Sequence, residues 1–403
     1  MKPAHVWIVA LMFGFSVASY FERTILSVAA PLMMKEFELS PTSMGLVFSS
    51  FQLSYTLLMT PGGRWSDRFG PRNTLGIGCF GAAVLTSLLP IARSIPVLAA
   101  MRFLFGIFTA PLYPACGHMT SLTLPALQHT RVFGIVNAGA GVGGAISPLL
   151  FTFLIANLGW RLSFVAAGSA GILLSIAWML SVPDRRSVSP RAEAGSTNWG
   201  VLLRNPNLRW LIVGYFAIDY FQYIFVYWLY YYLGEVRKLP QADIAFYATM
   251  PFVAWFIMMP AGGWIADHLS ARHGLKFGLR TVTITCLILA SLCLIAAMSA
   301  EDTNLLVLLL SLALGFAAAA DVPFWSAAVS LGGGQAGAAG GLMNTGGNIG
   351  GALAPIVTPY LATHFGWSAG LYAGAAIAII GVIAWLRIDP APVGEPTAQT
   401  ATA

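Results

Sequence analysis

Charged residues are scarce in this sequence. Only 9% of its 403 residues are charged, whereas 57% are hydrophobic. A soluble globular chain carries roughly a quarter charged residues, so there is too little charge here to cover a water-facing surface. The short alternating segments of a transmembrane β-barrel are also missing, and long unbroken apolar runs stand in their place. The composition therefore predicts an all-α membrane protein.

Reactive groups are equally sparse. The six histidines lie at or near expected loops, and the sequence contains neither a phosphate-binding Walker loop nor a serine in a nucleophile elbow. No catalytic set is visible, so the sequence argues against an enzyme, and we expect no cofactor and no metal. The four cysteines fall inside apolar runs and are expected to be packing residues: Cys79, Cys116, Cys286 and Cys293.

Apolar stretches long enough to cross a bilayer recur along the whole chain. A membrane-spanning helix needs about 20 apolar residues. Twelve such stretches are present, at 6–31, 43–63, 74–92, 96–119, 132–156, 162–182, 209–233, 241–266, 281–299, 304–329, 337–362 and 367–387.

One polar interruption divides the twelve spans into two sets of six. It predicts a first six-helix bundle over 1–182, a cytoplasmic linker over 183–208 and a second bundle over 209–388. The last segment, 389–403, is rich in Pro, Ala and Thr and is expected to be disordered.

The positive charges predict the orientation in the membrane. The net charge is +6, but the lysines and arginines lie in short loops between apolar spans, which indicates topology rather than a nucleic-acid surface. If the N-terminus is inside, fourteen loop Lys and Arg residues lie on that side and five on the other. We therefore expect a multi-pass protein of the inner membrane with both termini cytoplasmic.

The two halves repeat one another. Gly14, Tyr20 and Phe21 recur at a shift of 200, as do Gly62, Gly63 and Asp67. A glycine-rich pattern running from Gly134 to Trp160 recurs at a shift of 207, from 341 to 367. Three matches in register predict a duplicated six-helix unit. Parallel repeats of this kind are typical of transporters whose two halves rock about a central site.

The loop after the second span resembles the signature of the major facilitator superfamily. Its pattern is a glycine, three residues, Asp-Arg, one residue, a glycine and a basic residue. Glycines permit a tight turn there, and the charged groups can pair with helix ends, so we expect a gating latch. A degraded second copy retains an aspartate, and the predicted gating residues are Gly63, Asp67, Arg68, Gly70, Arg72 and Asp267.

A Gly-x-Gly-x-x-Gly pattern at 139–144 superficially matches a dinucleotide-binding loop. No strand precedes it, and no acidic residue stands about 20 positions later. The same glycines recur at 346–351, which a nucleotide site would not require. Small residues at this spacing allow membrane helices to pack closely, so we expect a packing role.

Ionisable residues inside membrane spans are costly and usually functional. There are five: Glu22, Arg23, Arg102, Asp219 and Asp321. The alternative is a set of structural ion pairs. In one plausible arrangement Arg23 points into a cavity while Glu22 turns toward the fourth helix and Arg102. An arginine suits a carboxylate because its planar fork donates two parallel hydrogen bonds, and protonation of Glu22 would then couple a proton to an anion.

The first span, with its sequence Tyr20-Phe21-Glu22-Arg23, resembles the first helix of the anion:cation symporter family. That family includes bacterial sugar-acid transporters and is similar to animal sialin. Further matches are 52–67, 106–114, 323–325 and 340–348, so the resemblance covers most of the chain. One departure is Thr109, which stands where sugar-acid members tend to carry a second glutamate.

The resemblance implies that Arg23 binds the substrate carboxylate and that Glu22 carries a proton. Asp219 and Asp321 are further proton-coupling candidates, because they lie near mid-membrane in the second half. The remaining predicted substrate-binding residues are Tyr20, Tyr55, Arg102, Tyr220, Gln222, Tyr223, Trp325, Asn344 and Asn348.

We therefore predict a monomeric transporter of the major facilitator fold that carries a small organic anion together with protons, with no nucleic-acid partner. Two alternatives remain open: an exchanger or uniporter without proton coupling, and a transporter-like membrane sensor. The anion is open as well, since a sugar acid, a dicarboxylate, an aromatic acid or a monocarboxylate would each satisfy the arginines.

Overall fold

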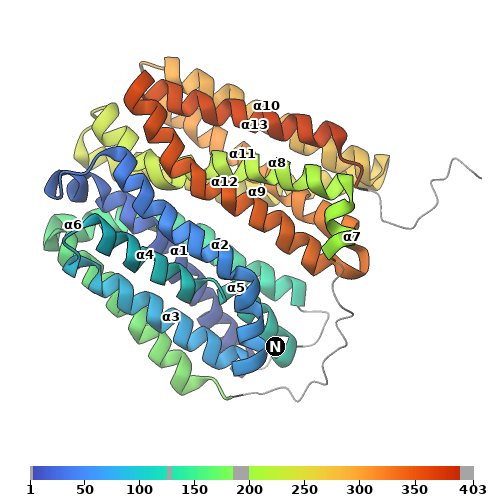
Figure 1. Cartoon of the computed structure of the whole chain (residues 1–403), viewed down its shortest axis with the longest axis horizontal. Coiled ribbons are helices and arrows are strands. Elements are labelled where there is room, and N and C mark those ends of the chain that lie inside the picture. Colours follow the sequence, from blue (N-terminus) through green and yellow to red (C-terminus); the bar gives the residue numbers. More distant parts are fainter. Residues whose placement is uncertain (1–2, 125–128, 185–198, 391–403) are drawn as a thin grey trace, which may run out of the picture.

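The computed structural model describes residues 3–124, 129–184 and 199–390, and nearly all of them are helical. The first half contains α1 (Pro3–Glu36), α2 (Pro41–Phe69), α3 (Pro71–Leu88), η1 (Leu89–Ile91), α4 (Ile95–Thr109), α5 (Leu112–Thr123) and α6 (His129–Ser181). The second half contains α8 (Pro206–Tyr231), η3 (Tyr232–Val236), α9 (Gln241–His273), α10 (Leu275–Ser299), α11 (Thr303–Gly332), η4 (Gly333–Gln335), α12 (Ala336–Phe365) and α13 (Trp367–Arg387). The two halves form separate bundles that lie side by side (Figure 1).

These helices account for the twelve predicted spans. In the described part of the chain, nine helices are long and apolar enough to cross a membrane, with α6 counted once. However, α6 contains two spans, because its backbone kinks at Gly159. The other two spans are α2 and α12, which carry more glycine and polar residues. The predicted twelve-helix fold is therefore confirmed, with α4 and α5 together forming the fourth span.

The linker and tail lie partly outside the described residues. Within the predicted linker at 183–208, the structure shows a short helix, α7 (Trp199–Arg204), which the sequence analysis did not anticipate. Of the predicted tail, only residues 389 and 390 are described. The domain boundaries stay a prediction.

The internal repeat is visible in the backbone turns. Gly159 has φ 74° and its partner Gly366 has φ 87°, and each separates two consecutive membrane helices. Gly70 and Gly274, with φ 80° and 90°, do the same before the third helix of each half. Positive φ strains a residue with a side chain, so glycine is required at these four turns.

The glycine-rich segments pack helices closely, as expected. A Cβ atom on Gly143 of α6 would overlap the carbonyl oxygen of Val17 in α1. The repeat-related Gly350 of α12 stands in the same relation to the carbonyl oxygen of Phe216 in α8. The same close helix pairing, α6 on α1 and α12 on α8, therefore holds each half together.

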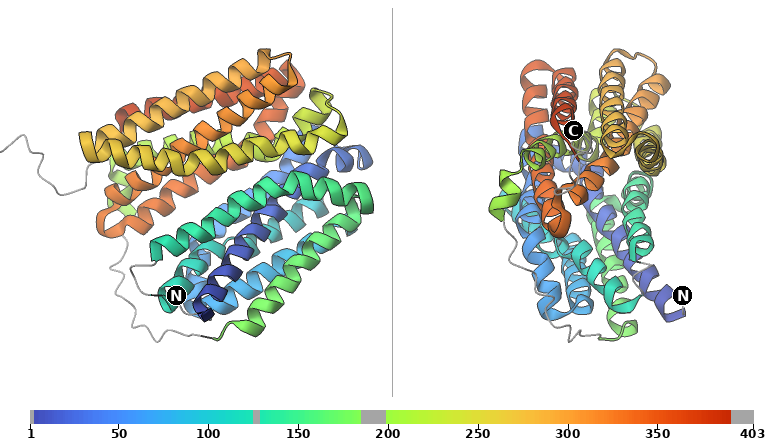
Figure 2. Two further views of the ribbon diagram at one scale, coloured as in Figure 1. Left: turned by 180° about the vertical axis from the view of Figure 1, so that it is seen from behind. Right: turned by 90° about the vertical axis from the view of Figure 1, so that its right-hand side faces the viewer.

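The two bundles meet toward one side of the molecule. We call the side with the start of α1 and the end of α13 the N-terminal side, and the opposite one the far side. On the far side α2 packs on α12, where a Cβ atom on Gly45 would overlap the carbonyl oxygen of Pro355 and the Ser49 hydroxyl donates to the carbonyl of Ala352 at 2.6 Å. Toward the N-terminal side the bundles diverge (Figures 1 and 2).

Candidate functional site

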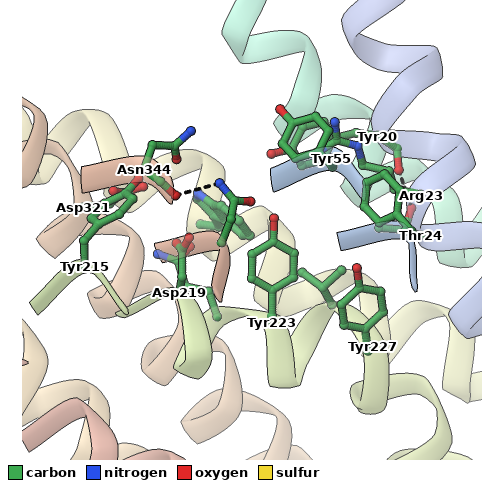
Figure 3. A pocket seen from close by; sticks show the side chains of 15 residues that line it. Tyr20, Arg23, Thr24, Tyr55, Tyr215, Asp219, Tyr223, Tyr227, Asp321 and Asn344 are labelled. Atoms are coloured by element: carbon green, nitrogen blue, oxygen red, sulfur yellow. Dashed lines mark hydrogen bonds between the residues drawn. The ribbon is translucent and has the colours of Figure 1, made fainter. Parts of the chain in front are cut away.

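A cavity of about 110 Å³ lies between the two halves, near the middle of the helices. Both halves line it, the first through α1 and α2 and the second through α8, α9, α11 and α12 (Figure 3). Its mixture of aromatic and polar walls is typical of small-molecule sites. The lining residues are Tyr20, Arg23, Thr24, Phe51, Tyr55, Tyr215, Asp219, Gln222, Tyr223, Val226, Tyr227, Trp255, Asp321, Asn344 and Asn348.

Arg23 is the cationic group of the cavity and is only 5% exposed. Its guanidinium carbon lies 4.3 Å from the ring centroid of Tyr55, 4.9 Å from that of Tyr20 and 5.0 Å from that of Phe51. In the described part of the chain no carboxylate pairs with it, and its Nε and Nη2 atoms lack hydrogen-bond partners. Aromatic rings compensate a buried cation only in part, so this guanidinium is available to an anion.

Arg102 supports the first helix from behind the cavity. Its guanidinium donates to the backbone carbonyls of Glu22 and Arg23 at 3.3 and 3.4 Å and lies over the ring of Phe105 at 4.6 Å. It was predicted to bind substrate, but it is not among the lining residues. Its position indicates a role in holding the backbone on which Arg23 is mounted.

Glu22 faces away from the cavity. Its carboxyl lies against α6, where a Cβ atom on Gly171 would be 2.6 Å from Oε1, and it interacts with the hydroxyl of Thr86 in α3. Among the described residues it forms no ion pair with Arg102, although the expected arrangement brought these two together. The 100° turn between neighbouring helix positions does separate Glu22 from Arg23, as expected.

Two carboxylates, Asp219 of α8 and Asp321 of α11, lie on the wall opposite Arg23 (Figure 3). Each is 7% exposed, and Oδ1 of Asp321 lacks a hydrogen-bond partner in the part of the chain that the structure describes. The hydroxyl of Tyr215 interacts with the Asp321 carboxyl and accepts a hydrogen bond from the indole of Trp325 at 3.0 Å. Trp325 was predicted to bind substrate; it lies outside the lining and fixes Tyr215 instead.

Polar side chains join the two halves beside the cavity. The amide of Gln52 in α2 donates to the Oδ1 atom of Asn348 and to the hydroxyl of Tyr223 at 3.2 Å. Its Oε1 accepts from Tyr227 at 3.4 Å. Gln52 is fully buried, so these bonds are shielded from water. This cluster links α2 with α8 and α12, and any rearrangement of the halves must break it.

Most of the residues predicted for the site do line the cavity: Arg23, Tyr20, Tyr55, Asp219, Gln222, Tyr223, Asp321, Asn344 and Asn348. Besides the three residues described above, Tyr220 falls outside, because its hydroxyl points to Thr358 at 3.4 Å. The prediction missed Thr24, Phe51, Tyr215, Val226, Tyr227 and Trp255.

A stripe on α8 contains two of the missed residues, Tyr215 and Tyr227. Tyr215, Asp219, Tyr223 and Tyr227 follow one another at intervals of four residues. Residues at this spacing share one face of a helix. The buried aspartate in that stripe was the signal that could have selected these tyrosines from the many aromatic residues of α8.

The predicted gating motif lies at the turn between α2 and α3. Gly70 adopts the positive φ of that turn, and Arg72 donates to the backbone carbonyls of Met179 and Val182 at the end of α6. The surroundings of Gly63 and of the Asp67 side chain lie outside the described part of the chain, while Arg68 and Asp267 are exposed. Arg72 thus holds the end of α6 within its own half, and a latch between the halves stays a prediction.

The described residues contain no group of three or more His, Cys, Asp or Glu side chains that could hold a metal ion. A buried cavity between two repeat-related bundles that meet on one side is the architecture of a secondary transporter. The family comparison agrees. The model of the Major Facilitator Superfamily matches residues 12–276 and 272–402, and the chain belongs to this superfamily. It is therefore a multi-pass membrane transporter rather than an enzyme.

Similar proteins indicate the kind of transporter within the superfamily. The chain is 29% identical to a probable sulfoacetate transporter of Cupriavidus necator, over 97% of this chain and 95% of that one. It is 26% identical to the hexuronate transporter of Bacillus subtilis (98% and 97% covered) and 29% identical to a D-galactonate transporter of Escherichia coli (92% of each). These relatives confirm the resemblance to transporters of organic anions.

A solved structure shows the same fold. The bacterial homologue of the human lysosomal transporter Spinster, in an inward-facing and unoccupied conformation, superposes with a TM-score of 0.82. The sequences are 17% identical, with 96% of this chain and 97% of that chain covered.

Proposed function

We propose that this protein is a secondary active transporter that moves a small organic anion, a sugar acid or another carboxylate, across the inner membrane together with protons. The observation that carries the proposal is Arg23, a buried guanidinium without a carboxylate partner among the described residues, in a cavity between the two halves. A substrate carboxylate would supply the missing partner through two parallel hydrogen bonds.

The relatives support this substrate class, because sulfoacetate, hexuronate and galactonate are all organic anions. We use the word seam for the contact between α2 and α12 on the far side, at Gly45 and Pro355. In the proposed cycle this seam opens while the N-terminal side closes. With both termini cytoplasmic, the structure would be the inward-facing state. We propose that the protein acts as a monomer, since each chain has its own complete cavity.

Glu22 is the candidate that carries the coupled proton. It is buried, it lies one residue from Arg23, and it leaves the cavity free for substrate. Taking up a proton would remove a negative charge from the surroundings of Arg23 and Arg102. The membrane potential sets the requirement: each charge moved is worth about 2.3 kcal/mol per 100 mV, so a monoanion needs at least two protons to be drawn in by the potential.

An exchanger without proton coupling is the second candidate. The observation that favours it is Thr109, which stands where sugar-acid transporters tend to have a glutamate. Its hydroxyl is bonded to the carbonyl of Phe105 in its own helix at 3.0 Å, so this position of α4 offers no titratable group.

Uptake into proteoliposomes tests both candidates. With an imposed inward proton gradient, wild-type protein should accumulate a labelled hexonate, and collapse of the gradient should stop accumulation. Arg23→Ala should abolish uptake, and Glu22→Gln should keep exchange of internal for external anion while losing the response to pH. Exchange that ignores the gradient in wild type would contradict proton coupling. Transport that survives Arg23→Ala would contradict the proposed anion site.

A further inference from the structure

The cavity presents basic and acidic groups to its interior. Arg23 contributes a guanidinium group from α1, while Asp219 and Asp321 contribute two carboxyl groups from α8 and α11. All three side chains are more than nine-tenths buried. In Figure 3 the arginine and the two aspartates lie at opposite ends of the cavity, with Tyr223 between them.

These groups do not pair with one another. No ion pair joins Arg23 to either aspartate among the described residues. Within the same part of the chain, two nitrogen atoms of Arg23 and one carboxyl oxygen of Asp321 lack a hydrogen-bond partner. Unpaired polar groups inside a membrane protein are costly, and a ligand that satisfied both ends would remove that cost.

A simple anion can pair with the groups at only one end of the cavity, the end that holds Arg23. A monocarboxylate bound to Arg23 would leave the two carboxyl groups of the opposite wall without a partner. The second carboxylate of a dicarboxylate would lie close to Asp219 and Asp321, where like charges repel. A molecule with a carboxylate at one end and an ammonium group at the other would instead pair with both walls.

The acidic wall is also shaped for a cationic group. The hydroxyl of Tyr215, which lines the cavity together with Asp321, is fixed by a hydrogen bond from the indole of Trp325. The rings of Tyr223 and Tyr227 are stacked at 5.7 Å and line the cavity with Trp255. Aromatic faces of this kind attract ammonium groups.

We infer that the preferred substrate is a zwitterion, an ω-amino carboxylate whose carboxylate binds Arg23 and whose ammonium group binds Asp219 and Asp321. This inference rests on the proposed function, because it takes the Arg23 cavity as the transport site. The two charged groups must be separated along the substrate, since the walls that bind them belong to opposite halves. An α-amino acid, with both groups on one carbon, should therefore bind less well.

Matched ligands that differ in one group test the inference. Binding of 5-aminopentanoate, 5-hydroxypentanoate and pentanoate would be measured calorimetrically at pH 7 with purified full-length protein, without a pH gradient. The amino compound should bind at least about tenfold more tightly than either partner, as expected for a charge-assisted hydrogen bond. 4-Aminobutanoate and 6-aminohexanoate should also bind more tightly than the unsubstituted carboxylates of the same length, and one of the three chain lengths should bind best.

Variants assign the preference to the acidic wall. Asp219→Asn combined with Asp321→Asn should remove the tenfold preference and leave pentanoate binding at least as tight, which also shows that the variant is folded. The matched control is Asp243→Asn, an exposed acid in the first turn of α9, which should keep the preference.

Several outcomes would overturn the inference. These are equal or tighter binding of the hydroxy or unsubstituted compound, a preference that survives the double variant, and a wild-type protein that binds galactonate but none of the amino compounds. Stronger pentanoate binding on addition of sodium would assign the acids to a metal cation and also overturn it. The Arg23→Gln variant distinguishes failure of this inference from failure of the proposed function. If pentanoate still binds to this variant as tightly as to wild type, then Arg23 is not the anion site, and the proposed function itself is contradicted.

Discussion

The two halves of this transporter share a backbone design but differ in chemistry. At the shift of 200 that relates their first helices, Arg23 corresponds to Tyr223 and Asp219 corresponds to Ser19. One half therefore brings a cation to the shared cavity, and the other brings acids. Glycine contacts and turns are duplicated, whereas charges are not. The repeat thus preserves how helices pack and leaves the cavity walls free to diverge.

The largest effect expected from this difference is at Arg23. Arg23→Gln should weaken carboxylate binding at least about a hundredfold, because it removes a buried, charge-assisted contact worth about 3 kcal/mol. The repeat-related Tyr223→Phe removes a neutral hydroxyl and should cost no more than about tenfold. Calorimetric titration with one carboxylate measures both. Similar losses in the two variants would contradict this chemical difference between the halves.

The similarity of the halves predicts equal effects at their glycine contacts. Gly143→Ala and Gly350→Ala should each lower the stability by about 1–3 kcal/mol, since the new methyl group would overlap a backbone carbonyl of the neighbouring helix. The controls are Gly134→Ala and Gly341→Ala, where a Cβ atom meets nothing within 4 Å. Thermal unfolding in detergent provides the measurement. A strong effect at only one of the two contacts would show that the halves are packed differently.

A smaller effect is expected where the halves touch. Gln52→Leu removes hydrogen bonds to α8 and α12, each worth about 1 kcal/mol, and should favour opening of the far side. Labelling of Ser49→Cys by a membrane-impermeant thiol reagent, in protein without its native cysteines, should become faster. Ser50→Ala is the control, because the Ser50 hydroxyl bonds only to Val47 of its own helix. Unchanged labelling would mean that backbone contacts alone hold the seam.

The smallest effects are expected at the exposed ion pairs of each half. Arg161 pairs with Glu36 in the first half, and Lys276 pairs with Asp389 at 2.6 Å in the second. All four side chains are more than a third exposed, so water screens the pairs. Arg161→Gln and Lys276→Gln should each change stability by less than about 1 kcal/mol in thermal unfolding. A larger loss in one variant would reveal a contact specific to that half.

The sequence was sufficient to predict the fold because membrane spans leave a strong local signal. Twelve apolar stretches, one polar interruption and repeated glycines predicted the helices and their duplication. Two local features were not predicted, because they hardly change the length of an apolar run. They are the separation of α4 from α5 at 110–111 and the short helix α7.

The site was predictable where a residue is chemically unusual in a membrane. Arg23, Asp219 and Asp321 stood out as buried charges, and all three line the cavity. Which face of a helix a residue occupies depends on tertiary packing. The sequence alone therefore did not show that Arg102 lies behind α1 or that Glu22 packs against α6.

The seam at Gly45 and Pro355 has a consequence for how new transport specificities arise. At this point α2 meets the backbone of α12 without an intervening side chain, so this part of the closure on the far side relies on chain shape rather than on side-chain chemistry. Mutations that alter the cargo at Arg23 or Asp321 leave that closure intact. Evolution or protein engineering can thus change the substrate specificity of the cavity one residue at a time, while α2 and α12 continue to close against each other.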